Sequence, residues 1–159
     1  MSQPKNLSKN FPESEFIHSR TAARLGIKNT MSKAERINAK KLCTNVLQPY
    51  RDHIKSPVTV TSGYRCKALN TKIGGSSTSY HMEACAADVR DSKKSLEYAA
   101  NWMMDNCGKN IDQIIYEYGA WLHVQIAKPG RKPRSRFLTA YRKNGKTHYA
   151  KGLKPELCK

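Results

Sequence analysis

The sequence predicts a single α+β domain in which helices pack on a central antiparallel sheet. Three observations lead to this class: a run with helical spacing and its own start signal, several short β-rich runs, and a pair of such runs separated by a two-residue turn. A chain of 159 residues has the usual size of one domain and can bury one core. We therefore expect one functional site.

The N-terminal part of the chain divides into a polar lead-in and a first helix. Residues 1–13 are polar and contain two prolines, so we expect a flexible segment there. Ser32 and Glu35 have the spacing of a capping box, in which each side chain binds the backbone N–H of the other residue. Apolar residues then recur at helical spacing, which predicts an amphipathic helix over about 33–48 that ends at Pro49.

The middle of the chain alternates between strands and helices. Val58–Thr61 alternates β-branched residues and runs into a Ser-Gly pair, which is typical of a strand before a turn. Lys67–Ile73 should form a short helical turn, and the small apolar residues of Ala84–Val89 suit a buried strand. Ser92 can cap a second helix, and Gly108 lies just beyond its expected end.

The C-terminal part of the chain predicts a hairpin followed by a basic loop. Ile111–Tyr118 and Trp121–Ile126 are β-rich and are separated by Gly-Ala, which favours two antiparallel strands with His123 on the second. The basic run Lys128–Arg136 should be a loop, and Phe137–Tyr141 is expected to add an edge strand. Together these elements give the predicted antiparallel sheet.

The chain is strongly basic. Lysine and arginine number 29 against 12 acidic residues, which gives a net charge of +17. A charge of this size predicts attraction to a polyanion such as nucleic acid, anionic lipid, lipopolysaccharide or an acidic cell-wall polymer. The same charge would also serve as a solubilising surface, so it does not by itself select a function.

The sequence has no pattern of a membrane span or of an export signal. No apolar run approaches the ~20 residues that cross a bilayer. The first residues lack the apolar core of a secretory signal, so we expect synthesis in the cytoplasm. The five cysteines are odd in number and form no CxxC pair, so reduced thiols are expected instead of a disulfide framework.

Residue types that bind metal ions occur close together in SYHMEACAADVR. His81 lies beside a Gly- and Ser-rich stretch, and Asp88 follows at the end of a buried strand. With His123 from the hairpin, nitrogen and oxygen donors of this kind suit a zinc ion that keeps a fourth position open. Alternatively, the histidines are ordinary hydrogen-bonded residues and Asp88 caps the following helix. Spacing alone leaves both interpretations open.

The run SGYRCKALNTKIGGSSTSYHMEACAADV resembles the signature of the zinc D-Ala-D-Ala carboxypeptidase and L-alanyl-D-glutamate endopeptidase family, which has SGYR, LN, IGG, SxH and HxxGxAxD in this order. IDQIIYEYGAWLHVQI resembles the second block of that family, which ends in WxHV. SEFIHSRTAARLGIKN and LQPYRD resemble the N-terminal part of its phage and bacterial members. The likeness covers roughly residues 14 to 150.

The resemblance implies which residues would carry out the chemistry. It places one zinc ion per chain on His81, Asp88 and His123. Arg65 of SGYR matches the arginine that binds substrate and stabilises charge on the attacked carbonyl. Some branches of the family have a catalytic acid three residues before the last histidine, where this chain has Ala120. Glu117 is then the remaining candidate for the catalytic acid or base.

The resemblance also bears on residues around the ligands. Gln113, with its neighbour Asp112, matches the DQ block of the family, where either an orienting role or a structural hydrogen bond is implied. The other candidates for substrate binding are Arg65, Ser79 and Trp121. Ala84 replaces the usual glycine and requires a local adjustment if that position has a positive φ. Cys85 is expected to pack in the core and not to bind the metal.

Together these observations predict that residues 14–159 form a zinc metallopeptidase domain that hydrolyses an amide bond in the peptide stem or cross-link of bacterial peptidoglycan. A phage-type lysin, made without an export signal and acting at the cell wall after release, fits the sequence. The expected partners are stem peptides and anionic polymers of the cell envelope, and the expected oligomeric state is a monomer. Endopeptidase and carboxypeptidase activity are both compatible with the pattern.

Two alternatives stay open at this point. One is a non-catalytic virion or nucleic-acid-binding protein that retains the fold and uses the basic loop to contact phosphates. The other is a cytoplasmic peptidase that acts on a small dipeptide. Strong salt-dependent binding of DNA without zinc would favour the first alternative, whereas the width of the cleft would distinguish the second.

Overall fold

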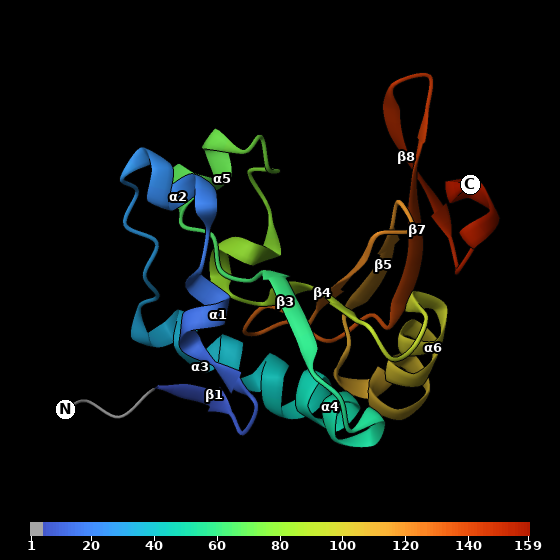
Figure 1. Cartoon of the computed structure of the whole chain (residues 1–159), viewed down its shortest axis with the longest axis horizontal. Helices are drawn as coiled ribbons and strands as arrows, with labels where there is room; N and C mark the ends of the chain where they lie inside the picture. The colour runs from blue at the N-terminus through green and yellow to red at the C-terminus, as the bar shows by residue number, and fades with distance from the viewer. Residues whose placement is uncertain (1–4) are drawn as a thin grey trace.

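The fold is built around one six-stranded sheet. The computed structural model describes residues 5–159, and the strands of the sheet lie in the order β3-β4-β6-β5-β7-β8 (Figure 1). Their bounds are β3 (Val58–Ser62), β4 (Ala86–Asp91), β5 (Gln113–Glu117), β6 (Trp121–Gln125), β7 (Arg136–Lys143) and β8 (Lys146–Lys151). The α+β class predicted from the sequence is confirmed.

The sheet is mixed, whereas the sequence predicted an antiparallel one. Neighbouring strands are antiparallel except β5 and β7, which are parallel. The last residue of β6 lies beside the first residue of β5. The loop after β6 crosses this end of β5, so β7 starts on the other side of β5 and runs parallel to it. The connecting loop, residues 126–135, contains most of the predicted basic loop.

The last strand, β8, was not predicted from the sequence. It pairs with β7 and forms the edge of the sheet, so the prediction that Phe137–Tyr141 lies at the edge is wrong. The turn between the two strands is Asn144-Gly145, and both residues have a positive φ. An Asn-Gly pair is the strongest short-range signal for a hairpin. This signal was present in the sequence and would have identified β8.

Helices and a two-stranded element complete the domain. The α-helices are α1 (Glu13–Ile17), α2 (Arg20–Leu25), α3 (Lys33–Leu42), α4 (Gln48–Ile54), α5 (Lys67–Lys72) and α6 (Leu96–Cys107). A π-helical segment, η1 (Cys43–Leu47), joins α3 to α4, and the 3₁₀ turns are η2 (Tyr80–Glu83), η3 (Gly108–Asn110) and η4 (Pro155–Cys158). Within residues 5–159, no helix is long and apolar enough to cross a membrane.

The first predicted helix starts as expected but continues further. Ser32 and Glu35 form the capping box in both directions. Pro49 does not end the helix, because the π-helical segment precedes it and Pro49 lies in the first turn of α4. A residue in the first turn needs no backbone N–H for helical hydrogen bonding, so a proline is tolerated there. The chain therefore stays helical to Ile54.

The second predicted helix starts later than expected. Its N-cap is Ser95, not Ser92. The Oδ1 atom of Asp91 accepts hydrogen bonds from the backbone N–H groups of Lys93 and Lys94. These bonds hold the residues after β4 in a turn, so the helix cannot start until the turn is complete. The serine that follows the turn then caps the helix.

The N-terminal segment packs on the domain. β1 (Asn6–Ser8) and β2 (Phe11–Pro12) form a small antiparallel pair. Leu7 and Phe11 are buried in the hydrophobic core. Of the lead-in predicted over residues 1–13, the first four lie outside the described residues, and Leu7 and Phe11 from the rest contribute to the core. The start of the catalytic domain at residue 14 stays a prediction.

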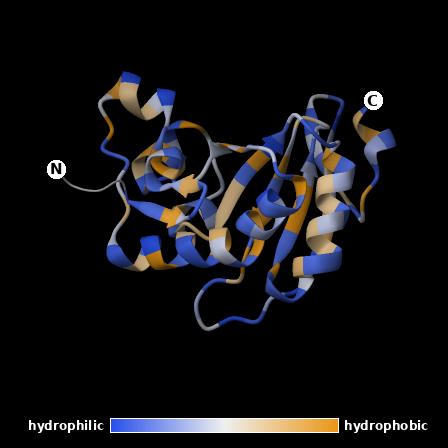
Figure 2. Ribbon diagram, turned by 60° about the horizontal axis from the view of Figure 1, so that its bottom comes forward, coloured by the Kyte–Doolittle hydropathy of each residue, from blue (hydrophilic) through white to orange (hydrophobic). Residues whose placement is uncertain are grey.

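The two faces of the sheet differ in what covers them. On one face, side chains such as Ile114 and Val124 are fully buried in the core, and α6 packs against β5 and β6 (Figure 1). Successive side chains of a strand point to opposite faces. Ile115 and His123, which are opposite each other on β5 and β6, therefore point away from α6. Figure 2 shows hydrophobic and hydrophilic residues along the strands of the sheet. We call the two sides the covered face and the open face; the candidate site lies on the open face.

Candidate metal centre

The central strands place two of the three candidate ligands next to each other. Asp88 on β4 lies directly opposite His123 on β6, and side chains at opposite positions share one face of a sheet. The Oδ1 atom of Asp88 and the Nδ1 atom of His123 are 3.1 Å apart. Both residues are more than nine-tenths buried. The register of the sheet is therefore sufficient to bring these two ligands together.

The third candidate ligand, His81, comes from the turn η2 that precedes β4. Its Nε2 atom is 3.3 Å from Oδ1 of Asp88, and its Nδ1–H donates to the backbone carbonyl of Gly63 at 2.7 Å. A Cβ atom added to Gly63 would lie 2.6 Å from the carbonyl oxygen of Phe16. Glycine is therefore required where the chain leaves β3, because a side chain would displace the carbonyl that orients His81.

The turn that carries His81 ends at Ala84, which has a φ of 57°. The positive φ considered from the sequence is thus present, and it costs an alanine about 1–2 kcal/mol. The backbone N–H of Ala84 donates to the carbonyl of His81 at 3.2 Å, which closes the turn. Cys85 follows in the hydrophobic core and lies outside the ligand cluster, as predicted.

Hydrogen bonds define which nitrogen of each neutral histidine carries the proton. A carbonyl only accepts, so His81 carries its proton on Nδ1 and has a bare Nε2. The Nε2 atom of His123 is 2.7 Å from Oε1 of Gln125, whose amide nitrogen donates to Asp112 at 2.8 Å. His123 therefore donates through Nε2, so Nδ1, which lies 3.1 Å from Oδ1 of Asp88, is the nitrogen left to bind a metal ion once the ring is neutral.

Three acceptor atoms consequently converge on one point. They belong to His81, Asp88 and His123 and lie within 4.8 Å of one another. When both rings are neutral, three acceptors this close repel one another unless a proton or a metal cation lies between them. Two imidazole nitrogens and one carboxylate oxygen, with the second nitrogen of each ring already donating a hydrogen bond, are a donor set that zinc prefers. The residues present therefore fit a zinc ion.

The charge states of the cluster also suit a cation. Burial alone would raise the pKa of Asp88, but its close contacts with His81 and His123 hold it well below its usual range. Burial lowers the pKa of His81. Asp88 is therefore an ionised carboxylate and His81 a neutral imidazole at neutral pH. These are the forms in which such side chains bind a metal ion. For His123, burial is outweighed by the hydrogen bond to Asp88 and by the negative charges of Asp88 and Glu117, which raise its pKa, so a metal ion that binds its Nδ1 atom replaces a proton.

Arg65 lies beside the cluster, just after the end of β3. Its Nε–H donates to the hydroxyl of Ser62 at 3.0 Å, and its Nη2 is 3.4 Å from Oδ2 of Asp88. Its backbone N–H donates to the carbonyl of His81 at 3.1 Å. The guanidinium group is thus held from two sides, and its side chain is 16% exposed. It places a fixed positive charge next to the metal ligands.

Glu117 is the further acid that the hairpin brings to the cluster. It ends β5, and its Oε1 is 4.0 Å from Nδ1 of His123. Burial, together with the negative charge of Asp88, raises the pKa of Glu117 to about 7. Ala120 is exposed in the turn between β5 and β6. The carboxyl group beside the cluster is therefore six residues before the histidine, not three.

The comparisons with known proteins agree with this geometry. A family model described as Peptidase M15 matches residues 9–125. The chain belongs to the peptidase M15 family. M15 peptidases are zinc enzymes, so membership suggests a metallopeptidase that acts on a peptide-type substrate. No curated protein matches the chain significantly. The family match includes the ligand cluster, Arg65 and Glu117, and it ends at Gln125, the last residue of β6.

The ligand cluster of this M15 peptidase lies in a cleft of about 670 Å³. Ser79, Gln113 and Trp121, which were candidates for substrate binding, all line this cleft. The Nε1 atom of Trp121 is buried, and its N–H lies near Glu117, whose pKa it lowers. The hydroxyl of Ser79 accepts a hydrogen bond from the backbone N–H of His81 at 3.3 Å.

Part of the cleft in this M15 peptidase comes from beyond the family match. Arg134, Arg136 and Tyr149 line it, whereas Lys128–Arg136 was predicted to be a basic loop with no part in the metal site. Their position follows from the parallel pairing of β7 with β5, in which Arg136 lies next to Gln113. That pairing joins segments distant in sequence. Local patterns therefore carried no signal for it.

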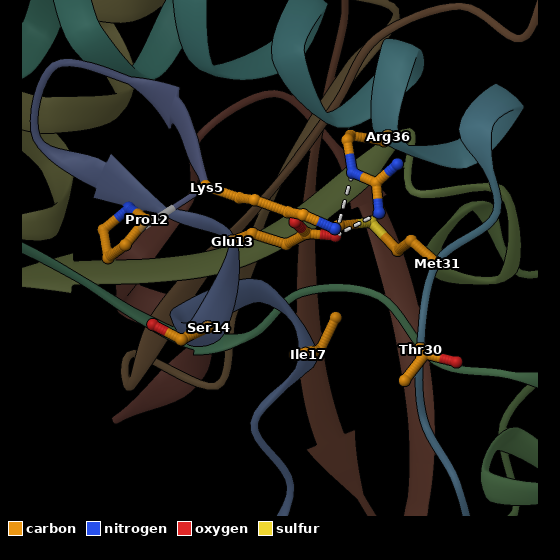
Figure 3. Close-up of a pocket in the computed structure, with 8 residues that line it drawn as sticks. All are labelled: Lys5, Pro12, Glu13, Ser14, Ile17, Thr30, Met31 and Arg36. Carbon is orange, nitrogen blue, oxygen red and sulfur yellow. Dashed lines mark hydrogen bonds and ion pairs between the residues drawn. The ribbon is translucent and has the colours of Figure 1, made fainter. Parts of the chain in front are cut away.

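A second hollow, of about 400 Å³, lies between the N-terminal segment and α3 (Figure 3). It is lined by Lys5, Pro12, Glu13, Ser14, Ile17, Thr30, Met31 and Arg36. The Oε1 atom of Glu13 accepts hydrogen bonds from Nε and Nη2 of Arg36 at 3.0 and 2.9 Å. This ion pair joins α1 to α3, and it engages the Glu13 carboxylate that lines the hollow. The cleft with the ligand cluster is therefore the stronger candidate for the active site.

Proposed function

We propose that this M15 peptidase hydrolyses an amide bond in the peptide stem or cross-link of bacterial peptidoglycan. The observation that carries the proposal is the convergence of His81, Asp88 and His123 in a cleft, with Arg65 and Glu117 beside them. Metal ligands and an acid that share one cleft favour a hydrolase over a binding protein. The resemblance to enzymes that cut wall peptides supports the substrate class.

We assign the metal to three residues and the proton transfers to one. One zinc ion held by His81, Asp88 and His123 would polarise the scissile carbonyl and lower the pKa of the attacking water. Glu117, whose pKa is about 7, can take a proton from that water and pass it to the leaving amine. Its Oε1 atom is 4.0 Å from Nδ1 of His123. This position supports the role, because a water bound next to the metal ligands would then lie close to the Glu117 carboxyl group.

Arg65 would stabilise the charge that develops on the substrate. As the amide is attacked, negative charge accumulates on its carbonyl oxygen. The Arg65 guanidinium is held by Ser62 and Asp88 before any substrate arrives. A charge that is already in place needs no rearrangement at the moment of reaction, which makes it effective in stabilising a transition state.

The charge of the cleft supports an acidic peptide as the substrate. Arg134 and Arg136 line the cleft on the side of β7, in addition to Arg65 near the metal ligands. Stem peptides of peptidoglycan carry free carboxylates, which such side chains attract. We propose that Ser79, Gln113 and Trp121 hold the peptide backbone. Their position along the wall of the cleft supports this role.

We further propose that the protein is a phage-type lysin, made in the cytoplasm of the host and active at the cell wall after release. Its net charge of +17 supports attraction to the anionic polymers of the cell envelope. A monomer whose own surface provides this attraction would reach the wall without a separate binding module. Residues 14–159 would form the catalytic domain.

A second candidate function rests on the same charge. Residues 129–136 are exposed and include four basic side chains, which suit contacts with the phosphates of nucleic acid. A protein that only bound nucleic acid would use this loop without zinc. DNA binding that depends steeply on salt, in a protein that neither binds zinc nor cleaves peptidoglycan, would favour this second function.

The test of the proposal compares wild type with His123→Ala and His148→Ala. His148 is the matched control, because it is exposed on β8 and its neighbour Tyr149, not His148, lines the cleft. Each protein is incubated with purified peptidoglycan, and soluble fragments are identified by mass spectrometry. We expect wild type and His148→Ala to release fragments with a new amino group at one peptide bond and His123→Ala to release none. Release by His123→Ala at the wild-type rate would refute the mechanism.

A further inference from the structure

A chain of hydrogen bonds connects the ligand His123 to a residue beyond the family match. Nε2 of His123 lies 2.7 Å from Oε1 of Gln125, and the Gln125 amide nitrogen donates to Oδ2 of Asp112 at 2.8 Å. Arg134 donates to both oxygens of Asp112, through Nε at 3.0 Å and Nη2 at 2.7 Å. We call the series Arg134, Asp112, Gln125 and His123 the outer relay.

The direction of the bonds in the outer relay is set at Asp112. Burial alone would raise the pKa of Asp112, but the hydrogen bonds from Arg134 and Gln125 lower it. Asp112 is therefore ionised at neutral pH and can only accept hydrogen bonds. Its two oxygens accept four, including one from the backbone N–H of Arg134. Gln125 must then direct its nitrogen to Asp112 and its oxygen to His123.

The orientation of the Gln125 amide determines the state of His123. An oxygen next to Nε2 requires a proton on that nitrogen, so the proton that His123 gives up when a metal ion binds is the one on Nδ1. Nδ1 is the atom 3.1 Å from Oδ1 of Asp88 and is the nitrogen nearest the other two ligands. With a reversed amide, the proton would lie on Nδ1 and would block the atom that faces the ligand cluster.

We propose that Gln125 and Asp112 are positioning residues that hold His123 in the tautomer and orientation required for binding the metal ion. This inference rests on the zinc site proposed above. Groups that fix the second nitrogen of a histidine ligand change metal affinity by about 10- to 100-fold when they are removed. Arg134 supplies the charge that keeps Asp112 ionised, so the loop beyond the family match contributes to the metal site.

A purely structural role for the same bonds makes a different prediction. Asp112 and Gln125 also lie where the hairpin of β5 and β6 meets the loop that leads to β7. Bonds that only tied these segments together would affect the stability of the metal-free protein and leave the zinc affinity of the folded protein unchanged. Zinc affinity and stability must therefore be measured separately.

The first experiment compares the zinc affinity of wild type, Gln125→Met and Gln113→Met by competition with a chromophoric chelator at one pH. Gln113 is a matched control for zinc affinity, because it is a buried glutamine on the open face directly opposite Gln125. Methionine retains the approximate volume of glutamine. We expect the Kd for zinc to rise about 10- to 100-fold for Gln125→Met and to stay unchanged for Gln113→Met.

A second pair of variants tests the direction of the bonds. Asp112→Asn allows the Gln125 amide to reverse, so we expect weaker zinc binding. Adding Gln125→Glu to Asp112→Asn exchanges the positions of amide and carboxylate and again presents an acceptor to His123. We expect this double variant to recover most of the zinc affinity. Because the exchange also restores the hydrogen bond between positions 112 and 125, zinc affinity and the stability of the metal-free protein are compared for each variant.

The melting temperature of the metal-free protein reports on the fold of each variant. Equal zinc affinity for wild type and Gln125→Met would overturn the positioning role of the outer relay. The proposed zinc site itself would be unaffected by that result. Failure of the double variant to bind zinc more tightly than Asp112→Asn would likewise overturn it. Absence of zinc binding in wild type itself would overturn both the relay and the proposed function.

Discussion

The covered and open faces of the sheet use the same strands for opposite purposes. In β6, Leu122 and Val124 point to the covered face and are buried among apolar side chains, whereas His123 and Gln125 point to the open face and are buried among polar ones. Burial of apolar surface stabilises the folded state. Burial of converging acceptors opposes it unless a cation compensates.

The difference shows how the stability of one face supports the function of the other. The open face concentrates groups that would be unfavourable in an ordinary core, and the register of the sheet holds them in place. Departures from the usual pattern of side chains are expected at functional sites. Substitutions on the two faces should therefore separate into those that change chemistry and those that change folding.

The largest effect is expected for Asp88→Asn on the open face. The substitution removes the negative charge of the carboxylate that lies between the two histidine ligands. Binding of one zinc ion per chain should therefore be lost. Peptidoglycan hydrolysis should fall by at least about 1000-fold, which corresponds to about 4 kcal/mol of transition-state stabilisation. Zinc content after dialysis and the rate of fragment release measure the two effects. Retention of one zinc ion per chain by Asp88→Asn would contradict the assignment of the ligands.

Glu117→Gln should separate catalysis from metal binding on the same face. The amide cannot take a proton from water, so activity should fall by about 10²- to 10⁴-fold, the usual contribution of a general acid or base. Zinc affinity should be retained, because Glu117 lies outside the ligand cluster. Kinetic assay of zinc-loaded protein tests this expectation. A variant with unchanged turnover would show that another group transfers the proton.

Leu122→Ala tests the covered face directly next to a ligand. Leu122 is 1% exposed and neighbours His123 on β6. Removal of a buried leucine side chain should lower the free energy of unfolding by about 2–5 kcal/mol. Zinc affinity of the folded protein should be nearly unchanged, because the substituted side chain points away from the cluster. Urea unfolding and chelator competition provide the two values. A larger change in zinc affinity than in stability would contradict the separation of the faces.

The smallest effect is expected for Ala84→Gly, at the turn that carries His81. Glycine relieves a positive φ that costs alanine about 1–2 kcal/mol. The same change removes a buried methyl group worth about 0.8 kcal/mol and adds flexibility to the unfolded chain. These contributions oppose each other, so stability should change by less than about 1 kcal/mol. Thermal unfolding measures the difference, and a loss much greater than this would mean that the methyl group is needed for packing.

The local features of this fold could be predicted from the sequence. The capping box of Ser32 and Glu35, strand β3 and the hairpin of β5 and β6 each depend on residues within a few positions. His81, Asp88 and His123 were also identified from local runs and from the resemblance to a family. The structure brings these three residues into one cluster.

The features that could not be predicted depend on contacts between distant segments. The helix continues past Pro49 because a π-helical segment precedes that residue, and apolar periodicity does not reveal such a segment. The parallel pairing of β7 with β5 has no local signature. The ion pair of Arg134 with Asp112 depends on that pairing, so the contribution of the basic loop to the metal site was not visible in the sequence.

The central claim is that two histidines and one aspartate hold a zinc ion on the open face. The most direct measurement is the zinc K-edge X-ray absorption spectrum of purified protein with its metal content determined in parallel. The account predicts one zinc ion per chain with nitrogen and oxygen neighbours at about 2.0–2.2 Å, including two imidazoles. A spectrum dominated by sulfur neighbours at about 2.3 Å, or a protein that retains no zinc, would contradict it.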